Sequence, residues 1–154
     1  MIVTNVSPGP PVAFLLSHLG GVVARGFAEA LAPMGLEPRH FAVLGFVAAA
    51  EGQSQNALAD GLAIPPSRMV AVIDELEERR LVQRRSHPTD RRARAVHVTP
   101  KGRKTMAAAA ELAMAYEATV CSPLSVGERA ALSDLLGRLA AAQGLDGVHH
   151  ALRG

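Results

Sequence analysis

Positively charged side chains are concentrated in one short segment of the chain. Ten of the 16 lysine and arginine residues lie between residues 79 and 104, where Asp90 is the one acidic residue. They are Arg79, Arg80, Arg84, Arg85, Arg91, Arg92, Arg94, Lys101, Arg103 and Lys104. The formal net charge of the whole chain is only +2, so the clustering, and not the total, indicates a polyanionic partner such as DNA.

The densest part of this cluster is the tip of an expected hairpin, where residues 87–92 read His-Pro-Thr-Asp-Arg-Arg. The candidates for DNA contact there are Asp90, Arg91, Arg92 and Arg94. Three arginines cannot all pair with one aspartate. Arg92 is the best candidate for insertion into a narrow minor groove, where the potential is most negative, and Asp90 is expected to brace an arginine or the turn. A charge run is usually only solvated surface, but its place on a hairpin favours function.

A second set of candidates lies at the start of a helix that Pro66 can begin. The inner face of this helix has four apolar residues, Met69, Val72, Ile73 and Leu76. The outward residues near its N-terminus are then Ser67, Arg68, Val70 and Ala71. Arg68 can form two hydrogen bonds with a guanine edge, and Ser67 can bind a phosphate or a base. Val70 or Ala71 can contact a thymine methyl group.

An ordinary solvated helix face is the alternative interpretation of these residues. The acidic residues of the same helix all lie toward its far end, at Asp74, Glu75, Glu77 and Glu78. This asymmetry favours DNA binding, because a recognition helix enters the groove by its N-terminal end. Ser54 and Gln55, at the start of the preceding helix, are candidates for backbone contacts. Arg84, Arg85, Lys101, Arg103 and Lys104 are weaker candidates for phosphate contacts.

A ligand pocket is a further hypothesis. His18 and Arg25 on the first helix, with His40, Phe41 and Phe46 on the second, would offer a cation and apolar walls to an aromatic acid. The alternative, favoured for any single one of them, is that the phenylalanines are core and the others are interface or surface groups.

Enzymatic and metal chemistry find no support in the sequence. There is no glycine-rich phosphate loop, no pair of carboxylates in an apolar setting and no nucleophile with an evident base. Six histidines and one cysteine show no zinc spacing, so no cofactor or metal is expected. Cys121 has no nearby lysine or arginine in sequence to lower its pKa, and we interpret it as a packed structural thiol. A single cysteine excludes a disulfide within the chain and is typical of a reducing cytoplasm.

The elements that must position these residues are mainly helices. Hydrophobic residues make up 49% of the 154 residues and aromatic residues only 3%, which predicts an aliphatic, alanine-rich core. After an extended arm, helices are expected over residues 12–32, from Pro38 to about Glu51-Gly52, from Ser54, from Pro66, over 100–122, and after the Ser125–Glu128 capping box. Strands are expected from Leu81-Val82 and around residues 96–98. His18, Arg25 and Glu29 argue against a membrane span over residues 12–31.

This order predicts a mainly α fold with a small β-wing, a winged helix-turn-helix flanked by N- and C-terminal dimerisation helices. The expected parts of this one compact domain are an arm and dimerisation helix (1–35), the DNA-binding region (36–104), the C-terminal dimerisation helices (105–145) and a tail (146–154). The apolar stripes of the flanking helices exceed what a small winged domain can cover, and such stripes usually meet a second copy.

The chain resembles the MarR family of bacterial transcription regulators over residues 14 to 142. The matching motifs are Leu58-Ala59, Leu62-Ala63-Ile64, Val70 through Val82, Asp90-Arg91-Arg92, and Val98-Thr99-Pro100-Lys101-Gly102. The resemblance implies a homodimer that binds a pseudo-palindromic operator in double-stranded DNA. It further implies a cytoplasmic, nucleoid-associated protein, usually a repressor, that releases DNA when a small aromatic or phenolic ligand binds between the dimer layer and the DNA-binding region.

Two departures from the family pattern leave alternatives open. Val70 and Ala71 stand where relatives commonly have polar residues, which shifts the expected base contact to Arg68. The same loss motivates a second hypothesis, a sequence-indifferent architectural DNA-binding protein. Arg80 stands where glycine is common, which either strains the helix end or adds a phosphate contact.

Overall fold

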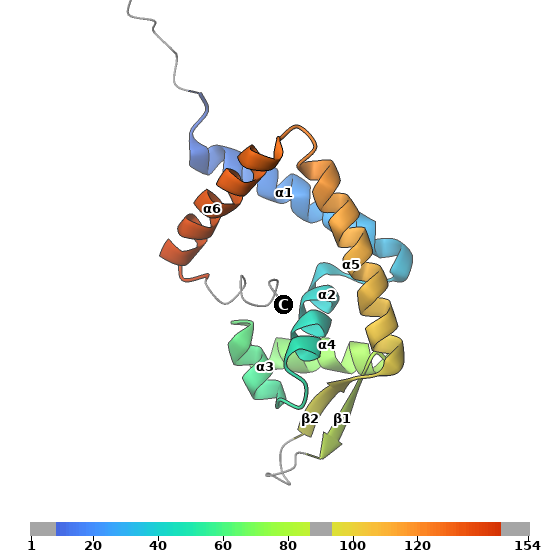
Figure 1. Ribbon diagram of the computed structural model, residues 1–154. Helices are drawn as coiled ribbons and strands as arrows, with labels where there is room; N and C mark the ends of the chain where they lie inside the picture. The colour runs from blue at the N-terminus through green and yellow to red at the C-terminus, as the bar shows by residue number, and fades with distance from the viewer. Residues whose placement is uncertain (1–8, 87–93, 146–154) are drawn as a thin grey trace, which may run out of the picture.

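The computed structural model describes residues 9–86 and 94–145, and the expected order of elements is confirmed there (Figure 1). The elements are α1 (Val12–Leu31), η1 (Ala32–Met34), α2 (Pro38–Ala49), α3 (Gln55–Gly61), α4 (Pro66–Glu78), β1 (Val82–Ser86), β2 (Arg94–Val98), α5 (Pro100–Val120) and α6 (Val126–Ala142). The short helix η1 was not expected. It extends α1 through Pro33 and ends at Gly35, whose φ of 64° is left-handed.

Local capping explains where most helices begin. Ser54 accepts a hydrogen bond from the amide of Ala57 at the start of α3, and Thr99 accepts one from Gly102 at the start of α5. The expected capping box of α6 is present, with Ser125 and Glu128 each bonded to the other's amide. Prolines occupy the first turn of α2, α4 and α5, where a missing amide proton has no cost.

The core lies among α2, α3, α4 and the hairpin, which form the lower half of the molecule in Figure 1. The inner residues of α4 are buried there as expected: Met69, Val72, Ile73 and Leu76. The hairpin is antiparallel, and Val82 pairs with Val98. An isolated bridge between Ser54 and Ala95 attaches β2 to the chain before α3. The hairpin is therefore held at one end of the helix-turn-helix.

Helices α1 and α6 form the other half of the molecule, and α5 runs from the hairpin up to them (Figure 1). Tyr116 of α5 donates a hydrogen bond to the carbonyl of Val23 in α1 at 3.0 Å. A Cβ atom at Gly26 would lie 2.3 Å from the Tyr116 hydroxyl, so this close approach requires glycine. No residue of α6 is buried. The apolar side chains exposed on these helices include Phe14, Leu15, Leu16, Leu19, Val22, Met114, Leu132, Leu135, Leu136 and Leu139.

By length and composition, the segment Val12–Met34 is long and apolar enough to cross a membrane, with a mean hydropathy of 1.2. Two observations argue against a lipid-facing helix. Arg25 and Glu29 lie within the segment, and charged groups are costly in a bilayer. Phe27 also packs edge-on against Phe41 of α2, so the C-terminal half of α1 is attached to the rest of the protein.

Candidate nucleic-acid interface

The N-terminal end of α4 presents an open face. Pro66, Ser67, Arg68, Val70 and Ala71 are all exposed, and Val70 is 43% exposed although it is apolar. Among the described residues, the Arg68 side chain has no hydrogen-bond or ion-pair partner. A guanidinium and small apolar groups at a helix N-terminus suit a DNA groove, because the backbone amides there also attract phosphate.

The turn before α4 sets the direction of this face. Ala63 has a φ of 51°, and the amides of Ala63 and Ile64 bond back to Asp60 and Ala59 at the end of α3. This left-handed residue reverses the chain sharply before Pro65 and Pro66 start α4. Helix α3, the turn and α4 are thus a helix-turn-helix whose second helix has an exposed N-terminus.

Arg84 lies in a different environment from the one its sequence position suggested. Its side chain is only 17% exposed and forms ion pairs with Asp74 and Glu77 of α4. Its Nε also donates to the amide oxygen of Gln55 at 3.2 Å. Arg84 therefore joins β1, α3 and α4 within the protein. Its guanidinium is already paired with two carboxylates, which leaves it little capacity to bind a phosphate.

Burial tends to raise the pKa of Glu77, but hydrogen bonds from the Arg84 backbone and side chain outweigh it and leave that pKa below its ordinary value. Burial tends to lower the pKa of Arg84, but the carboxylates of Glu77 and Asp74 outweigh it and leave that pKa above its ordinary value. Both groups are thus charged in the folded protein, and Arg84 compensates negative charge on the recognition helix.

Gln55, also expected at the interface, is turned inward. Its oxygen accepts from Arg84, and its Nε2 atom is buried with no partner among the described residues. Ser54 caps α3 with its hydroxyl oxygen. DNA contact by Ser54 and Gln55 stays a prediction, and for Gln55 it requires the side chain to turn outward.

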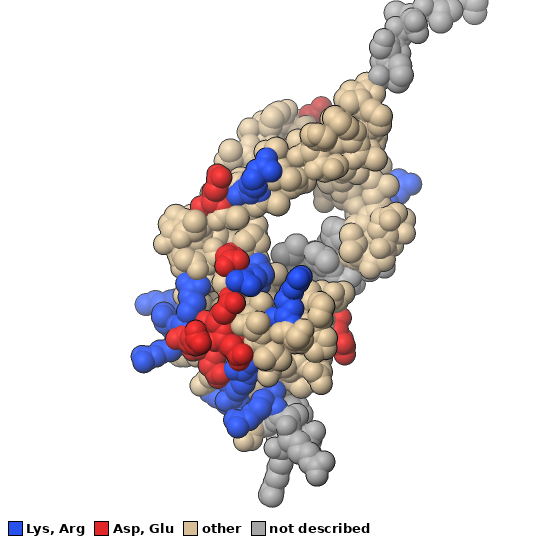
Figure 2. Space-filling view, turned by 180° about the vertical axis from the view of Figure 1, so that it is seen from behind, with Lys and Arg blue, Asp and Glu red and all other residues tan. Residues whose placement is uncertain are grey.

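The hairpin tip, with Asp90, Arg91 and Arg92, lies outside the described residues. At its base, Arg85 and Arg94 are exposed. Lys101 donates to the carbonyl of Arg79 at 2.9 Å, and Arg103 pairs with Glu51. Figure 2 shows acidic side chains gathered over the lower half of the molecule with lysine and arginine on either side, while the upper half is mostly uncharged.

Arg80 has a φ of 60°, which is the left-handed conformation that glycine adopts without strain. The strain expected as one of two alternatives is therefore present. The amides of Arg80 and Leu81 bond back to Glu77 and Leu76 and end α4. The Arg80 side chain is exposed, so a phosphate contact stays a second, compatible prediction.

The five ligand candidates do not share one environment. His18 is exposed and bonds to the carbonyl of Phe14, and Arg25 is exposed on α1. Phe41 and Phe46 pack against the core, which agrees with the alternative interpretation. His40 fits neither expectation: it is 4% exposed, and both of its ring nitrogens are hydrogen-bonded within the protein.

Cys121 bonds to the carboxylate of Glu117, and desolvation together with this contact raises the pKa of its thiol. A raised pKa leaves little thiolate, which agrees with an unreactive cysteine, but the side chain is half-exposed and not packed in the core as predicted. No cluster of three or more potential metal ligands occurs within residues 9–86 and 94–145.

A helix-turn-helix followed by a two-stranded wing, with an arginine and small side chains exposed at the start of the second helix, defines the winged helix-turn-helix class of DNA-binding proteins. Residues 34–93 match the sequence profile of the MarR family. The structure of the transcriptional repressor CouR bound to a 23-mer DNA duplex superposes with a TM-score of 0.78 at 34% identity, covering 84% of this chain and 92% of that one. The chain belongs to the MarR family, whose members are DNA-binding transcription regulators and not enzymes.

Two curated relatives agree with this assignment. A putative transcriptional regulatory protein for the hcr operon of Thauera aromatica is 36% identical over 105 residues, which are 68% of this chain and 63% of that protein's length. An HTH-type transcriptional repressor of Mycobacterium tuberculosis is 26% identical over 129 residues, covering 84% of this chain and 93% of the repressor.

Proposed function

We propose that this protein is a homodimeric, sequence-specific DNA-binding repressor of the bacterial cytoplasm that a small aromatic ligand releases from its operator. The observation that supports DNA reading most directly is the exposed N-terminal face of α4, with Arg68 free to meet a base edge. The curated mycobacterial relative is named a repressor, which favours repression over activation.

Dimerisation is proposed from the uncovered apolar surface. Helices α1 and α6 expose leucines along their length, and no residue of α6 is buried by the described part of the chain. An apolar helix face that stays in contact with water contributes little to stability, whereas a second copy of the chain would cover it. A two-fold dimer presents two copies of α4 to successive major grooves, about 34–36 Å apart, so the operator should be pseudo-palindromic.

The ligand class is proposed from relatives. CouR from Rhodococcus jostii RHA1 has been crystallised with p-coumaroyl-CoA, and a Mycobacterium tuberculosis MarR-family protein with p-aminosalicylic acid. Both ligands contain an aromatic ring and an acyl or acid group. Because both ring nitrogens of His40 are hydrogen-bonded within the protein, Arg25 and His18 are the polar predicted residues that remain accessible to such a ligand.

The test is selection of duplexes by the purified protein from fragmented genomic DNA, followed by gel shifts of selected and scrambled duplexes at moderate salt. A repressor should prefer the selected duplex by about a thousandfold or more, and small aromatic acids or their thioesters should weaken that complex. A ratio near one would instead support the architectural alternative, which the apolar Val70 and Ala71 motivate.

A further inference from the structure

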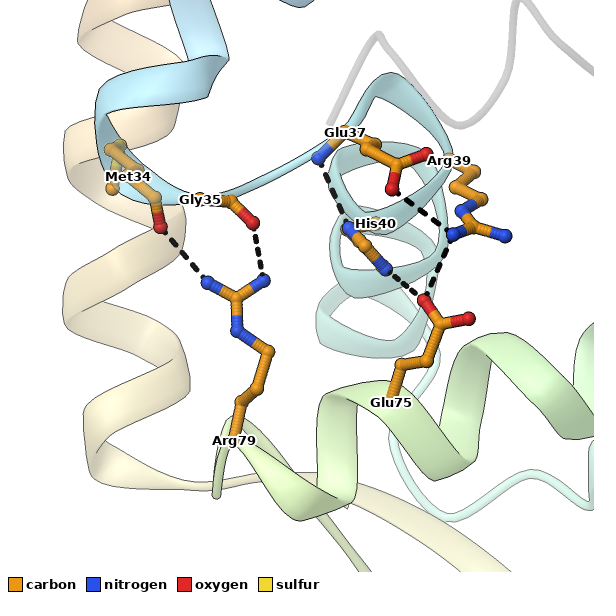
Figure 3. Close-up of polar contacts among 7 residues, drawn as sticks. All are labelled: Met34, Gly35, Glu37, Arg39, His40, Glu75 and Arg79. Carbon is orange, nitrogen blue, oxygen red and sulfur yellow. Dashed lines mark hydrogen bonds and ion pairs between the residues drawn. The ribbon is translucent and has the colours of Figure 1, made fainter.

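A group of polar contacts fastens the C-terminal half of α4 to the chain between α1 and α2 (Figure 3). We call it the α4 clasp. It consists of Glu75 on α4, Arg79 at the C-terminal cap of α4, Arg39 and His40 on α2, the amide and carboxylate of Glu37, and the carbonyls of Met34 and Gly35.

The first half of the clasp joins α4 to α2 through a buried histidine. His40 Nδ1 accepts the backbone N–H of Glu37 at 3.0 Å, so the ring proton sits on Nε2 and is donated to Glu75 at 2.6 Å. Arg39 reaches the same carboxylate oxygen at 3.1 Å. The hydrogen bond from His40, helped by the charge of Arg39, lowers the pKa of Glu75, so this carboxylate is ionised when it accepts.

The second half joins α4 to the end of η1. Arg79 donates from Nη1 to the carbonyl of Gly35 at 2.7 Å and from Nη2 to that of Met34 at 2.9 Å. Carbonyls at a helix end have no partner within their helix, and a cation there satisfies them. A Cβ atom at Gly35 would lie 3.1 Å from Arg79 Nη2, so glycine makes room for this approach.

The clasp lies at the opposite end of α4 from Arg68. The apolar contacts of Ile73 and Leu76 hold α4 in the core but impose little direction, whereas hydrogen bonds require particular distances and angles. The partners of the clasp lie at the end of η1 and at the start of α2. Because η1 continues directly from α1, a helix of the proposed dimer layer, the clasp connects α4 to that layer through η1.

We propose that His40, Glu75 and Arg79 are positioning residues, which set the orientation of α4 relative to the dimer layer and thereby its sequence selectivity without contacting DNA. This inference rests on the proposed DNA-binding function. It assigns to His40 a role in holding the recognition helix, in place of direct ligand contact.

The first experiment measures dissociation constants for a short duplex selected by the parent protein from a random library, and for a scrambled duplex of equal composition. Arg79→Gln removes the bidentate contact. His40→Asn keeps an acceptor for the Glu37 amide but cannot reach Glu75. Each variant should lower the ratio of selected to scrambled affinity by about tenfold or more, with the scrambled affinity and the salt slope unchanged. Arg79→Lys, which retains one carbonyl contact, should be intermediate.

A matched control is Arg129→Gln, which removes an exposed ion pair with Glu117 far from α4 and should keep the parent ratio. An unchanged ratio in folded Arg79→Gln and His40→Asn would overturn the proposal. Equal losses on both duplexes with a smaller salt slope would also overturn it, because Arg79 would then be a phosphate contact.

A second experiment needs no DNA, and so separates failure of the clasp from failure of the proposed function. Spin labels at Glu29→Cys on α1 and Ala71→Cys on α4, in a Cys121→Ser background and diluted with unlabelled protein, report the distance between the two helices. Arg79→Gln should shift or broaden that distance distribution. An unchanged distribution would overturn the proposal even if the parent showed no sequence preference.

Discussion

Arg68 and Arg84 were both candidates for DNA contact from the sequence, yet they face different partners. Arg68 is exposed at the start of α4, whereas Arg84 is enclosed by Asp74, Glu77 and Gln55. The arginine guanidinium can bind phosphates, base edges and carboxylates, so the residue type alone does not decide between them. The two side chains should therefore respond differently to substitution.

Arg68→Ala should relax the sequence preference of the repressor at the base it contacts. The expected cost on the preferred duplex is about 1–3 kcal/mol, with little change on scrambled DNA. Gel-shift titrations of both duplexes measure this. Equal affinities of the variant and the parent for the preferred duplex would show that the recognition face is misassigned.

Arg84→Gln should act on stability first. It leaves the carboxylates of Asp74 and Glu77 without their shared cation, and the expected loss is about 2 kcal/mol of unfolding free energy. Urea unfolding measures it. Arg85→Gln is the matched control, because Arg85 is the exposed neighbour in the same strand and should cost less than about 0.5 kcal/mol. Equal stabilities of the two variants would contradict the joining role of Arg84.

Acid should weaken the ion pair between Arg84 and Glu77. The pKa of Glu77 is lowered in the folded state, so its stabilisation is complete above its unfolded pKa and is lost as the pH falls through the folded value. The parent should therefore lose more unfolding free energy than Arg84→Gln between about pH 5 and pH 3. Parallel pH profiles for the two proteins would remove Glu77 from the account.

At the scale of elements, the end of α4 combines strain with several tertiary contacts. Arg80 is left-handed, while Thr99 donates to its carbonyl at 2.7 Å and Lys101 donates to that of Arg79. A non-glycine residue in this conformation costs about 1 kcal/mol, and these contacts to the start of α5 help to hold it.

Arg80→Gly should raise the unfolding free energy by about 0.5–1 kcal/mol, because glycine adopts this conformation without strain. Arg80→Ala is the control, since alanine retains the strain and should not gain. Thermal and urea unfolding distinguish the two. If Arg80 also binds phosphate, both variants should lose affinity on every duplex and lower the salt slope by about one.

For the whole molecule, the uncovered side of α6 has the largest consequence. Leu135 is 52% exposed and no residue of α6 is buried, so the described part of the chain leaves the apolar side of this helix uncovered. Leu135→Glu should convert the proposed dimer to monomers and weaken operator binding, because a charge cannot be buried at an apolar interface without a partner.

Sedimentation and gel shifts measure both effects, and Leu135→Met should preserve the dimer. A fully dimeric Leu135→Glu protein would show that the interface lies elsewhere. A monomeric parent would overturn the proposed assembly altogether.

The sequence alone determined the helix starts, the buried face of α4, the hairpin and the winged helix-turn-helix class, as well as the exposed position of Arg68. These features depend on capping and periodicity within a few residues, so they are readable locally.

The partners of Arg84, His40 and Arg79 were decided only by the tertiary structure. His40 meets Glu75 across 35 residues and Arg79 meets Met34 across 45. Glu37 and His40 cap α2 with unusual residue types, so no motif marked them. An ionisable group finds its partner through the packing of whole helices, and no local pattern specifies which charges that packing brings together.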